Sequence, residues 1–345
     1  MKSLCQTSLQ TAAARQAMLT KPAGSLGRLE ELAIWLAGCQ GEVCPEIKLP
    51  WISVFAADHG VTAEGVSAFP AVVTQEMVKN FAAGGAAITV LARENGAQFE
   101  VVDVGVFNDV TADLGPLPNL VSVRVASGSA NFMQQAAMTE SELQAALQAG
   151  EAAVERALAA GADLFIGGEM GIGNTTAAAA IISQLCDVPI ETVVGHGTGI
   201  NDKQKQHKAK VIQTALDLHR HAMTDAMGVL RHVGGLEIAA LTGAYLHGAR
   251  HGLPMVIDGV ISCAAALLAC KVAPQAKEWM VFGHQSVEPA QQAVFADLGV
   301  APLIDLQMRL GEGSGAALAI PLIKLACALH AQMATFEQAG VSGAD

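Results

Sequence analysis

The chain has 345 residues, of which 52% are hydrophobic and only 15% are charged, and its formal net charge is −12. This composition is typical of a globular protein with one large core or two ordinary domains. It argues against a basic nucleic-acid-binding surface and against a polybasic membrane patch, so we expect neither kind of partner.

Short apolar runs that end in Gly, Asp, His or Glu alternate with longer stretches rich in Ala and Leu. This alternation is typical of βαβ units around a buried parallel sheet. In chain order, strands are predicted at residues 51–56, 99–102, 121–125, 164–166, 255–257 and 279–282. We therefore expect an α/β fold with a Rossmann-like, mostly parallel sheet flanked by helices.

Helices are predicted where capping residues and the helical period agree. The first is marked by an apolar stripe of leucines at positions 26, 29, 32 and 36. A second follows the capping box of Thr139 and Glu142, and Gly161 is placed to end it. The last spans residues 316–333 and is interrupted early by Pro321.

No linker, repeat or low-complexity segment divides the chain. We expect the helices of the two ends to pack together as a small helical domain, formed by residues 1–45 and 310–345. This domain would complete the active site of a large α/β substrate-binding domain, residues 46–309.

Two further features of the sequence bear on where the protein works. The seven cysteines form no Cys-x-x-Cys pair, and residues 1–14 do not resemble an export leader, which favours a reduced cytoplasm. The longest strongly apolar stretch without charge, residues 259–270, is shorter than the roughly 20 residues of a membrane helix, so no membrane span is expected.

The most informative loop runs from residue 167 to residue 176 and follows a predicted strand. Ligands of open parallel sheets bind beyond the carboxyl ends of the strands. Four glycines precede a helix start capped by Asn174 and Thr175, so free backbone N–H groups could bind an anion here, although a plain tight turn is the alternative. A P-loop is excluded because Asn174 replaces its Lys, and Thr176 breaks the dinucleotide fingerprint.

Two more glycine clusters follow. Residues 195–199 precede a stretch with lysines at positions 203, 205, 208 and 210, of which we expect at most one to meet an anionic substrate and the others to lie on a solvated helix face. Glu312 stands between Gly311 and Gly313 before the last helix, either as a charge at the helix N-terminus or as a catalytic base.

Other reactive residues carry less information. Asp58 and His59 follow the first strand, but no other ligands with metal-like spacing accompany them, so we expect no metal and prefer a structural or substrate-orienting role for His59. No serine lies in a nucleophile elbow and no cysteine lies in an obvious nucleophile setting, which leaves covalent catalysis without support.

Four motifs together carry a resemblance to a known family: KPAGSLGRLE at residues 21–30, ADHGV at 57–61, GEMGIGNTT at 168–176 and MRLGEGSGA at 308–316. In this order, across nearly the whole chain, they resemble the nicotinate-nucleotide:dimethylbenzimidazole phosphoribosyltransferases, which make the lower-ligand nucleotide of cobalamin. The resemblance implies transfer of the phosphoribosyl group of nicotinate mononucleotide to 5,6-dimethylbenzimidazole. The products would be α-ribazole 5′-phosphate, with inversion at the anomeric carbon, and nicotinate. It also implies a homodimer and a reaction that needs no cofactor.

The resemblance also assigns roles to residues. Glu312 matches the catalytic carboxylate that removes the azole proton, and Glu169 resembles a second carboxylate, for which we expect a role in substrate orientation. Phosphate and nucleotide binding is implied for Gly171, Gly173, Asn174, Thr175, Gly197 and Lys208. The implied base pocket comprises Phe69, Pro70, Thr74, Met77 and Leu310.

Phe69, Met77 and His196 differ from the residues of some members of the family. These differences leave open whether benzimidazoles or purines are the preferred base. Two other functions remain as alternatives. A dinucleotide-dependent oxidoreductase would need a complete glycine fingerprint in the first βα turn, and a non-catalytic nucleotide-binding regulator would not need Glu312.

Overall fold

The computed structural model describes residues 1–112, 115–195, 197, 199 and 201–342. Its strands form one sheet in the order β3-β2-β1-β4-β5-β6-β7, and every described pair is parallel. The strands are β1 (Pro50–Ala57), β2 (Gln98–Gly105), β3 (Leu120–Ser122), β4 (Leu164–Met170), β5 (Met255–Ile257), β6 (Met280–Ser286) and β7 (Pro302–Met308). The expected α/β fold is confirmed. The strand order reverses between β1 and β4, which is where such sheets bind ligands.

Six of the strands match the apolar runs predicted from the sequence, with small shifts of their ends. The seventh, β7, was not predicted. It lies at the edge of the sheet and Leu306 is exposed on it, so it lacks the continuous apolar run of a strand buried on both faces.

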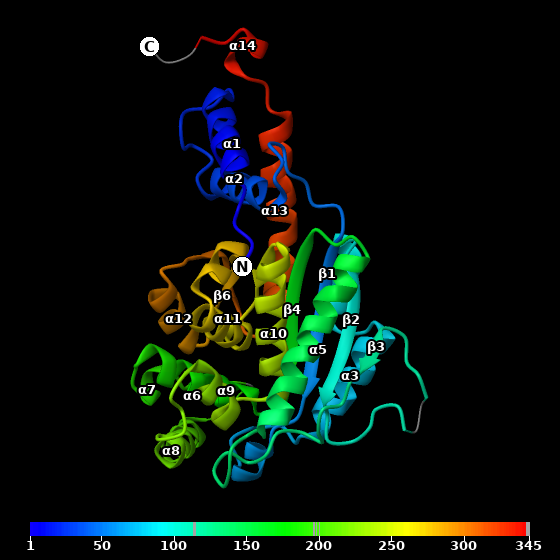
Figure 1. The fold of residues 1–345 in the computed structure, drawn as a ribbon, viewed down its shortest axis with the longest axis vertical. Coiled ribbons are helices and arrows are strands. Elements are labelled where there is room, and N and C mark those ends of the chain that lie inside the picture. Colours follow the sequence, from blue (N-terminus) through cyan, green and yellow to red (C-terminus); the bar gives the residue numbers. More distant parts are fainter. Residues whose placement is uncertain (113–114, 196, 198, 200, 343–345) are drawn as a thin grey trace.

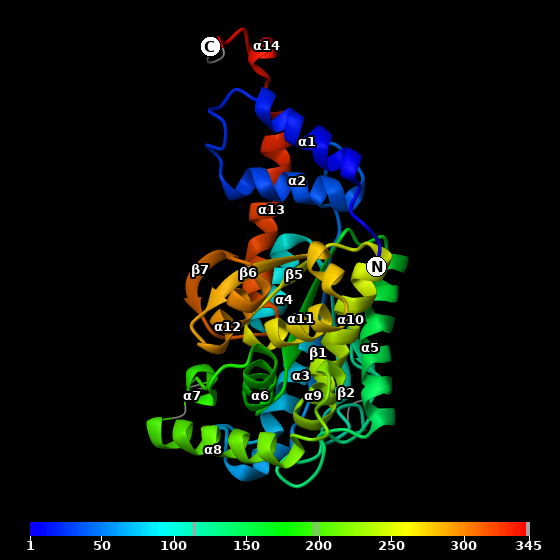
Figure 2. The same cartoon turned by 60° about the vertical axis from the view of Figure 1, so that its left-hand side comes forward.

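Helices cover both faces of the sheet (Figure 1). One face carries α5 (Glu140–Ala159), α10 (Leu236–His251) and α11 (Val260–Val272), and the other carries α3 (Val72–Ala83), α4 (Ala87–Asn95) and α13 (Ser314–Gln332). The helices α6 (Asn174–Cys186), α7 (Ile190–Val193), α8 (Asp202–His219) and α9 (Ala226–Val233) gather at the broad end of the molecule, as Figure 2 shows. The remaining helices are η1 (Gly60–Glu64), η2 (Pro274–Trp279), α12 (Ala290–Leu298) and α14 (Phe336–Ala339).

Helix α5 begins and ends where the sequence predicts. Thr139 and Glu142 form the expected capping box, and Gly161, with a φ of +82°, follows its last turn. The helix packs closely against α10, because Gly150 faces the backbone of Ala240 and Gly243 faces the backbone of Leu147. A side chain at either glycine would overlap the neighbouring helix, so these two positions fix the distance between α5 and α10.

Helices from the two terminal regions of the chain lie together in the narrow part of the molecule (Figure 1). Helices α1 (Gln6–Met18) and α2 (Arg28–Gln40) pack with α13, and Arg15 donates hydrogen bonds of 2.8 Å to the carbonyl oxygens of His330 and Ala331. The expected association of the terminal helices is thus confirmed. The division into domains at residues 45/46 and 309/310 stays a prediction.

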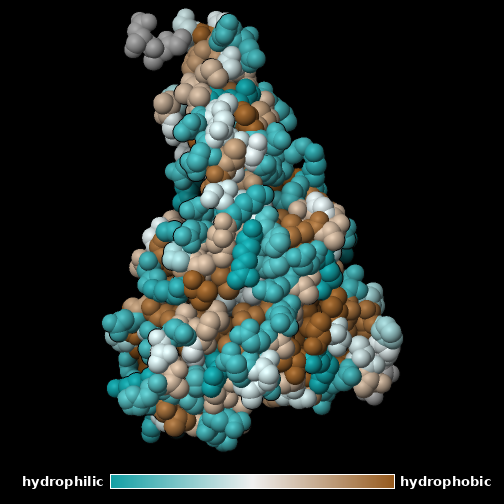
Figure 3. Space-filling view, in the orientation of Figure 1, coloured by the Kyte–Doolittle hydropathy of each residue, from teal (hydrophilic) through white to brown (hydrophobic). Residues whose placement is uncertain are grey.

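Helix α13 is also the one helix of the described residues that is long and apolar enough to cross a membrane by length and composition. However, 56% of its apolar window is buried, and it packs against α2, α4 and β6. Burial of this kind is typical of the core helix of a globular protein. On the face shown in Figure 3, the broad part of the molecule has apolar residues interspersed among polar ones.

Candidate active site

A cavity of about 230 Å³ lies at the carboxyl edge of the sheet. The segments that follow β4, β5, β6 and β7 contribute to it, together with residues from α3 and from the loop before it. Its described lining includes Glu169, Gly171, Gly173, Asn174, Thr175, Gly197, Lys208, Phe69, Met77, Leu310 and Glu312. The structure therefore brings together eleven of the thirteen residues that were predicted to form the site.

Glu312 sits in an unusual loop between β7 and α13. Gly311, Glu312 and Gly313 all have left-handed φ angles, of +86°, +65° and +88°. A non-glycine residue adopts this conformation at a cost of about 1–3 kcal/mol, which is tolerated where the surroundings impose it. The loop is pressed against β4, where Gly168 contacts the Glu312 carbonyl and leaves no room for a side chain. The carboxylate is therefore placed by the backbone.

Asp258, directly after β5, holds this loop in position. Its carboxylate accepts hydrogen bonds from the backbone N–H groups of Gly313 at 3.2 Å and Ala316 at 2.8 Å. A buried carboxylate at the start of α13 also lies at the positive end of the helix dipole. We missed Asp258 as a site residue from the sequence, although its place after a predicted strand was a usable signal.

The Glu312 carboxylate is suited to accept a proton. It is only 5% exposed, and its Oε2 atom has no hydrogen-bond partner among the described residues. Burial raises the pKa of Glu312 to about 6, Asp258 acts in the same direction, and a backbone hydrogen bond from Ile88 opposes them. A base with this pKa is ionised at neutral pH and is still basic enough to remove a proton.

Glu169 has a higher pKa than Glu312. Burial raises the pKa of Glu169 to about 8, and the negative charges of Glu237 and Asp258 add to this shift. The Asn174 amide donates a hydrogen bond to Glu169, which acts in the opposite direction. Glu169 therefore holds its proton to a higher pH than Glu312 does, and its protonated form can donate a hydrogen bond.

The predicted capping role of Asn174 is wrong. The N-cap of α6 is Gly173, with a φ of +95°, and no side chain caps the helix. The Asn174 side chain binds the buried carboxylate instead, because an ionisable group buried in the core needs a partner more than a helix end near a cavity does.

The turn itself uses two of the backbone N–H groups on which the anion-site prediction rests, and the prediction stays untested. The N–H of Asn174 donates to the Gly171 carbonyl at 3.0 Å and the N–H of Thr176 donates to the Gly173 carbonyl at 2.9 Å. Both groups are thus used within the turn. Positive charge for an anion comes from the side chains of Lys208 and Arg309, both of which line the cavity.

Lys208 is a buried cation in the lining of the cavity. It is only 2% exposed, and its Nζ atom donates to the Thr175 hydroxyl at 2.6 Å. Burial lowers the pKa of Lys208 to about 8, and the nearby Glu288 opposes the shift. Glu288 itself accepts a hydrogen bond of 3.0 Å from the Gly197 backbone. The three other nearby lysines do not line the cavity: Lys203, Lys205 and Lys210.

Much of the remaining lining of the cavity is apolar. It is formed mainly by Val66, Phe69, Val73, Met77, Ile172, Val260, Ile261 and Leu310. The other two predicted pocket residues do not line it. Pro70 lies exposed beside the rim, and the buried Thr74 accepts a hydrogen bond of 3.1 Å from the Ile172 backbone, so it supports the glycine turn from behind.

His59 belongs to a layer behind the cavity. It is fully buried, and its Nε2 atom lies 2.6 Å from Glu237 Oε1. Burial disfavours the charged imidazole, but Glu237 and Asp58 outweigh this effect and raise the pKa of His59. Gly171 lies against this pair, so His59 supports the wall of the cavity. His196, singled out in the sequence, lies outside the described residues.

Among the polar lining residues that were not predicted are four near the carboxyl ends of β6 and β7: His284, Ser286, Glu288 and Arg309. They come from β6, from the segment after it and from the segment after β7. Only the run before His284 was recognised as a strand, and β7 was missed, so the sequence did not indicate that Arg309 lies at the same edge as Lys208.

The chain resembles known proteins along its whole length. A family model described as Phosphoribosyltransferase matches residues 1–341. A protein of Pseudomonas fluorescens (strain SBW25), named nicotinate-nucleotide--dimethylbenzimidazole phosphoribosyltransferase, is 54% identical over 341 residues, which is 99% of this chain and 96% of the relative. A protein of Pseudomonas aeruginosa (strain UCBPP-PA14) with the same name is 53% identical, over 96% of this chain and 93% of the relative.

A solved structure shares the fold. The crystal structure of CobT from Thermus thermophilus superposes with a TM-score of 0.93 at 45% sequence identity. The match covers 98% of this chain and 100% of that chain. Similarity of sequence and of fold therefore extends over the sheet, the cavity and the terminal helices alike.

Proposed function

The chain belongs to the phosphoribosyltransferase family whose model spans residues 1–341, and from this premise we propose that it transfers the phosphoribosyl group of nicotinate mononucleotide to 5,6-dimethylbenzimidazole. The products are α-ribazole 5′-phosphate, nicotinate and a proton. One observation carries the proposal: a single cavity holds an unpartnered carboxylate oxygen, a buried lysine and apolar lining residues. The names of the two Pseudomonas relatives support the choice of substrates.

In this reaction a ring nitrogen of the benzimidazole attacks C1′ of the ribose on the face opposite to nicotinate. The bond from C1′ to the pyridine nitrogen breaks, and its electron pair leaves with nicotinate. The configuration at C1′ therefore inverts. Because the departing ring becomes neutral at nitrogen, the leaving group needs no proton, and the enzyme must only align the reactants and remove the azole proton.

We assign the azole proton to Glu312. Its Oε2 atom is free to accept a hydrogen bond, and its raised pKa makes it a stronger base than an exposed carboxylate. Glu169 is assigned to substrate orientation, since its protonated carboxyl can donate to a ribose or base acceptor. The buried acidic groups around the cavity also favour the positive charge that develops on the ribose in the transition state.

The 5′-phosphate is placed where Lys208, Thr175 and Gly197 line the cavity. Lys208 and Arg309 supply positive charge, and the left-handed backbone at Gly173 and Gly197 lets a phosphate approach the main chain. The flat base is placed among the apolar residues of the lining, which suit a dimethylated ring.

We further propose that the protein is a cytoplasmic homodimer. The edge strand β7 and the loop after it expose Leu306 and Leu310, and Leu310 also borders the cavity. A second subunit on this edge would cover apolar surface next to the site. All seven cysteines are free, which agrees with a reducing compartment.

The two alternative functions fit the structure less well. A dinucleotide-dependent oxidoreductase would bind its cofactor at a glycine fingerprint after β1, where this chain has Asp58, His59 and Gly60. A non-catalytic regulator would not require a strained, buried carboxylate at Glu312.

Incubation with nicotinate mononucleotide and an equimolar mixture of dimethylbenzimidazole, benzimidazole and adenine tests the proposed function. Mass spectrometry should detect nicotinate and the new ribotides. We expect the dimethylated base to be preferred over benzimidazole by about tenfold, because each buried methyl group contributes roughly 0.8 kcal/mol. Binding of the nucleotide without any product would favour the non-catalytic regulator. If the protein showed no binding and formed no product, this result would contradict the family's activity for this chain.

The pH profile of kcat/KM for nicotinate mononucleotide should be bell-shaped. Glu312 must be ionised, and since its pKa is raised to about 6, the rate should rise with pH through about 6. Lys208 must be protonated to bind phosphate, and since its pKa is lowered to about 8, the rate should fall above about 8. Loss of the acidic limb in a Glu312→Gln variant would assign that limb, and a wild-type profile that is flat around pH 6 would contradict the role of Glu312 as the base.

A further inference from the structure

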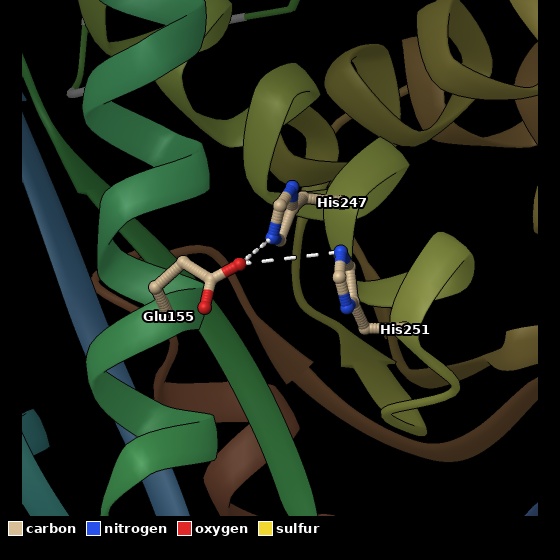
Figure 4. A group of neighbouring side chains, drawn as sticks. All are labelled: Glu155, His247 and His251. Carbon is tan, nitrogen blue, oxygen red and sulfur yellow. Dashed lines mark hydrogen bonds and ion pairs between the residues drawn. The ribbon is translucent and has the colours of Figure 1, made fainter.

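A second cluster of chemically reactive side chains lies on the outer surface of the α5–α10 helix pair. Glu155 projects from α5, and His247 and His251 project from α10 toward it (Figure 4). A carboxylate oxygen of Glu155 and one ring nitrogen of each histidine all lie within 4.8 Å of one another. His247 pairs with Glu155 directly, and the Nε2 atom of His251 lies 4.0 Å from the same oxygen.

The sequence places these three residues together for simple reasons. His247 and His251 are four residues apart on one helix, so they lie on the same face one turn apart, and their rings stack with centroids 4.2 Å apart. The close contacts at Gly150 and Gly243 hold α5 against α10, so that Glu155, farther along α5, faces the histidines. The cluster is thus supported by two rigid helices in close contact and not by a loop.

We propose that Glu155, His247 and His251 form a surface site for a divalent transition-metal ion, with Zn²⁺ as the best match. Two imidazole nitrogens and one carboxylate oxygen are a ligand set that zinc uses with water in the fourth position. In a tetrahedral site with bonds of roughly 2.0–2.2 Å, neighbouring ligand atoms are about 3.4 Å apart. The three ligand atoms need only small side-chain rotations to reach this spacing.

The surroundings of the cluster allow a cation to enter. The side chains of Glu155 and His251 are 56% and 48% exposed, so solvent reaches the cluster, whereas His247 is only 13% exposed and anchors it against the helix pair. The neighbouring Arg250 is paired with Glu151 at 3.4 Å, so this positive charge is already partly compensated. Glu155 then supplies the negative charge that faces the metal.

The site lies away from the cavity. The three residues are near the carboxyl ends of α5 and α10, which lead into the starts of β4 and β5, whereas the cavity is at the opposite, carboxyl edge of these strands. The metal therefore acts as a clamp between two helices and takes no part in the transfer reaction. Metal binding should stabilise the fold and leave turnover unchanged.

Calorimetric titration of the tag-free protein with Zn²⁺ tests the site, and Co²⁺ can replace zinc to give an absorption spectrum that reports on the ligands. We expect one ion per chain at this site. His247→Ala and His251→Ala should each weaken binding by at least about tenfold, Glu155→Gln by about tenfold, and the double histidine variant should lose the site. His221→Ala, which removes an exposed histidine outside the cluster, is the matched control and should bind as the wild type does.

Thermal melting and turnover complete the test. Zn²⁺ should raise the melting temperature of the wild type and of His221→Ala but not that of the double variant. Nucleotide formation should be the same with and without a chelator, and in His247→Ala. The proposal is overturned if the wild type binds no zinc, or if the double variant keeps the same stoichiometry and affinity, since the metal would then lie elsewhere. Because binding and melting are measured without substrate, these results do not depend on the proposed reaction.

Discussion

Replacement of Glu312 by glutamine is expected to lower kcat for nucleotide formation by about 10³-fold, the middle of the range that a positioned general base contributes. Glutamine keeps the size of the side chain and its place in the left-handed loop, but it cannot take the azole proton. Binding of nicotinate mononucleotide should be nearly unchanged, because phosphate binding is assigned to Lys208 and not to Glu312. Stopped assays of nicotinate release give kcat, and equilibrium dialysis gives the binding constant.

Three controls separate chemistry from structure in this experiment. Glu312→Ala should also be inactive, which excludes a special effect of the amide. Glu94→Gln removes an exposed carboxylate from α4 and should behave as the wild type does. Melting temperatures close to that of the wild type show that the loop still folds. An active, folded Glu312→Gln enzyme would mean that another group is the base.

Replacement of Lys208 by methionine should raise the KM for nicotinate mononucleotide by about 10²-fold and leave kcat at saturation much less affected. The Lys208 ammonium is buried and lies beside Thr175 and Gly197, so it offers a charge-assisted hydrogen bond to phosphate with little competition from water. Such bonds contribute roughly 1.5–3 kcal/mol, which corresponds to about 10-fold to 150-fold in affinity. Steady-state kinetics over a range of nucleotide concentrations measures both constants.

The matched control is Lys210→Met, which removes an exposed lysine from the same helix. It should leave both constants unchanged, since Lys210 does not line the cavity. A kcat defect without a KM defect in Lys208→Met would place the phosphate elsewhere. The proposed orientation of the ribose and the base in the cavity would then be wrong as well.

Much of the fold could be predicted because its signals are local. The buried strands of a parallel sheet are short apolar runs, and the capping box of Thr139 and Glu142 marks the start of α5 without reference to any distant residue. β7 was missed because an edge strand is partly exposed and its neighbour in the sheet, not its own composition, makes it a strand. Arg309 was missed as a site residue for the same reason, because it directly follows β7.

The site was predicted only as far as motifs and family resemblance reach. Glu169, Glu312 and Lys208 do line one cavity, but their sequence spacing does not show it. The partners of Asn174 and Asp258 could not be predicted, because each side chain has several hydrogen-bonding options and tertiary contacts decide among them. Thr74 was misplaced for the same reason, since its hydroxyl binds a backbone N–H from outside the cavity.

The contact between Arg15 and the last turn of α13 affects how the protein folds while it is synthesised on the ribosome. These residues are separated by 315 and 316 positions, so α1 and α2 are synthesised about 300 residues before α13, against which they pack. Until α13 has been made, α1 and α2 can pack against each other, but the face of α2 that contacts α13 lacks its native partner. Apolar surface exposed in this way makes a nascent chain prone to aggregation. Long-range closure of this kind also slows folding, since the entropy of joining distant segments is lost before the contacts form. The loop that carries Glu312 leads directly into α13, so this part of the proposed site is synthesised together with the helix that holds the N-terminal helices.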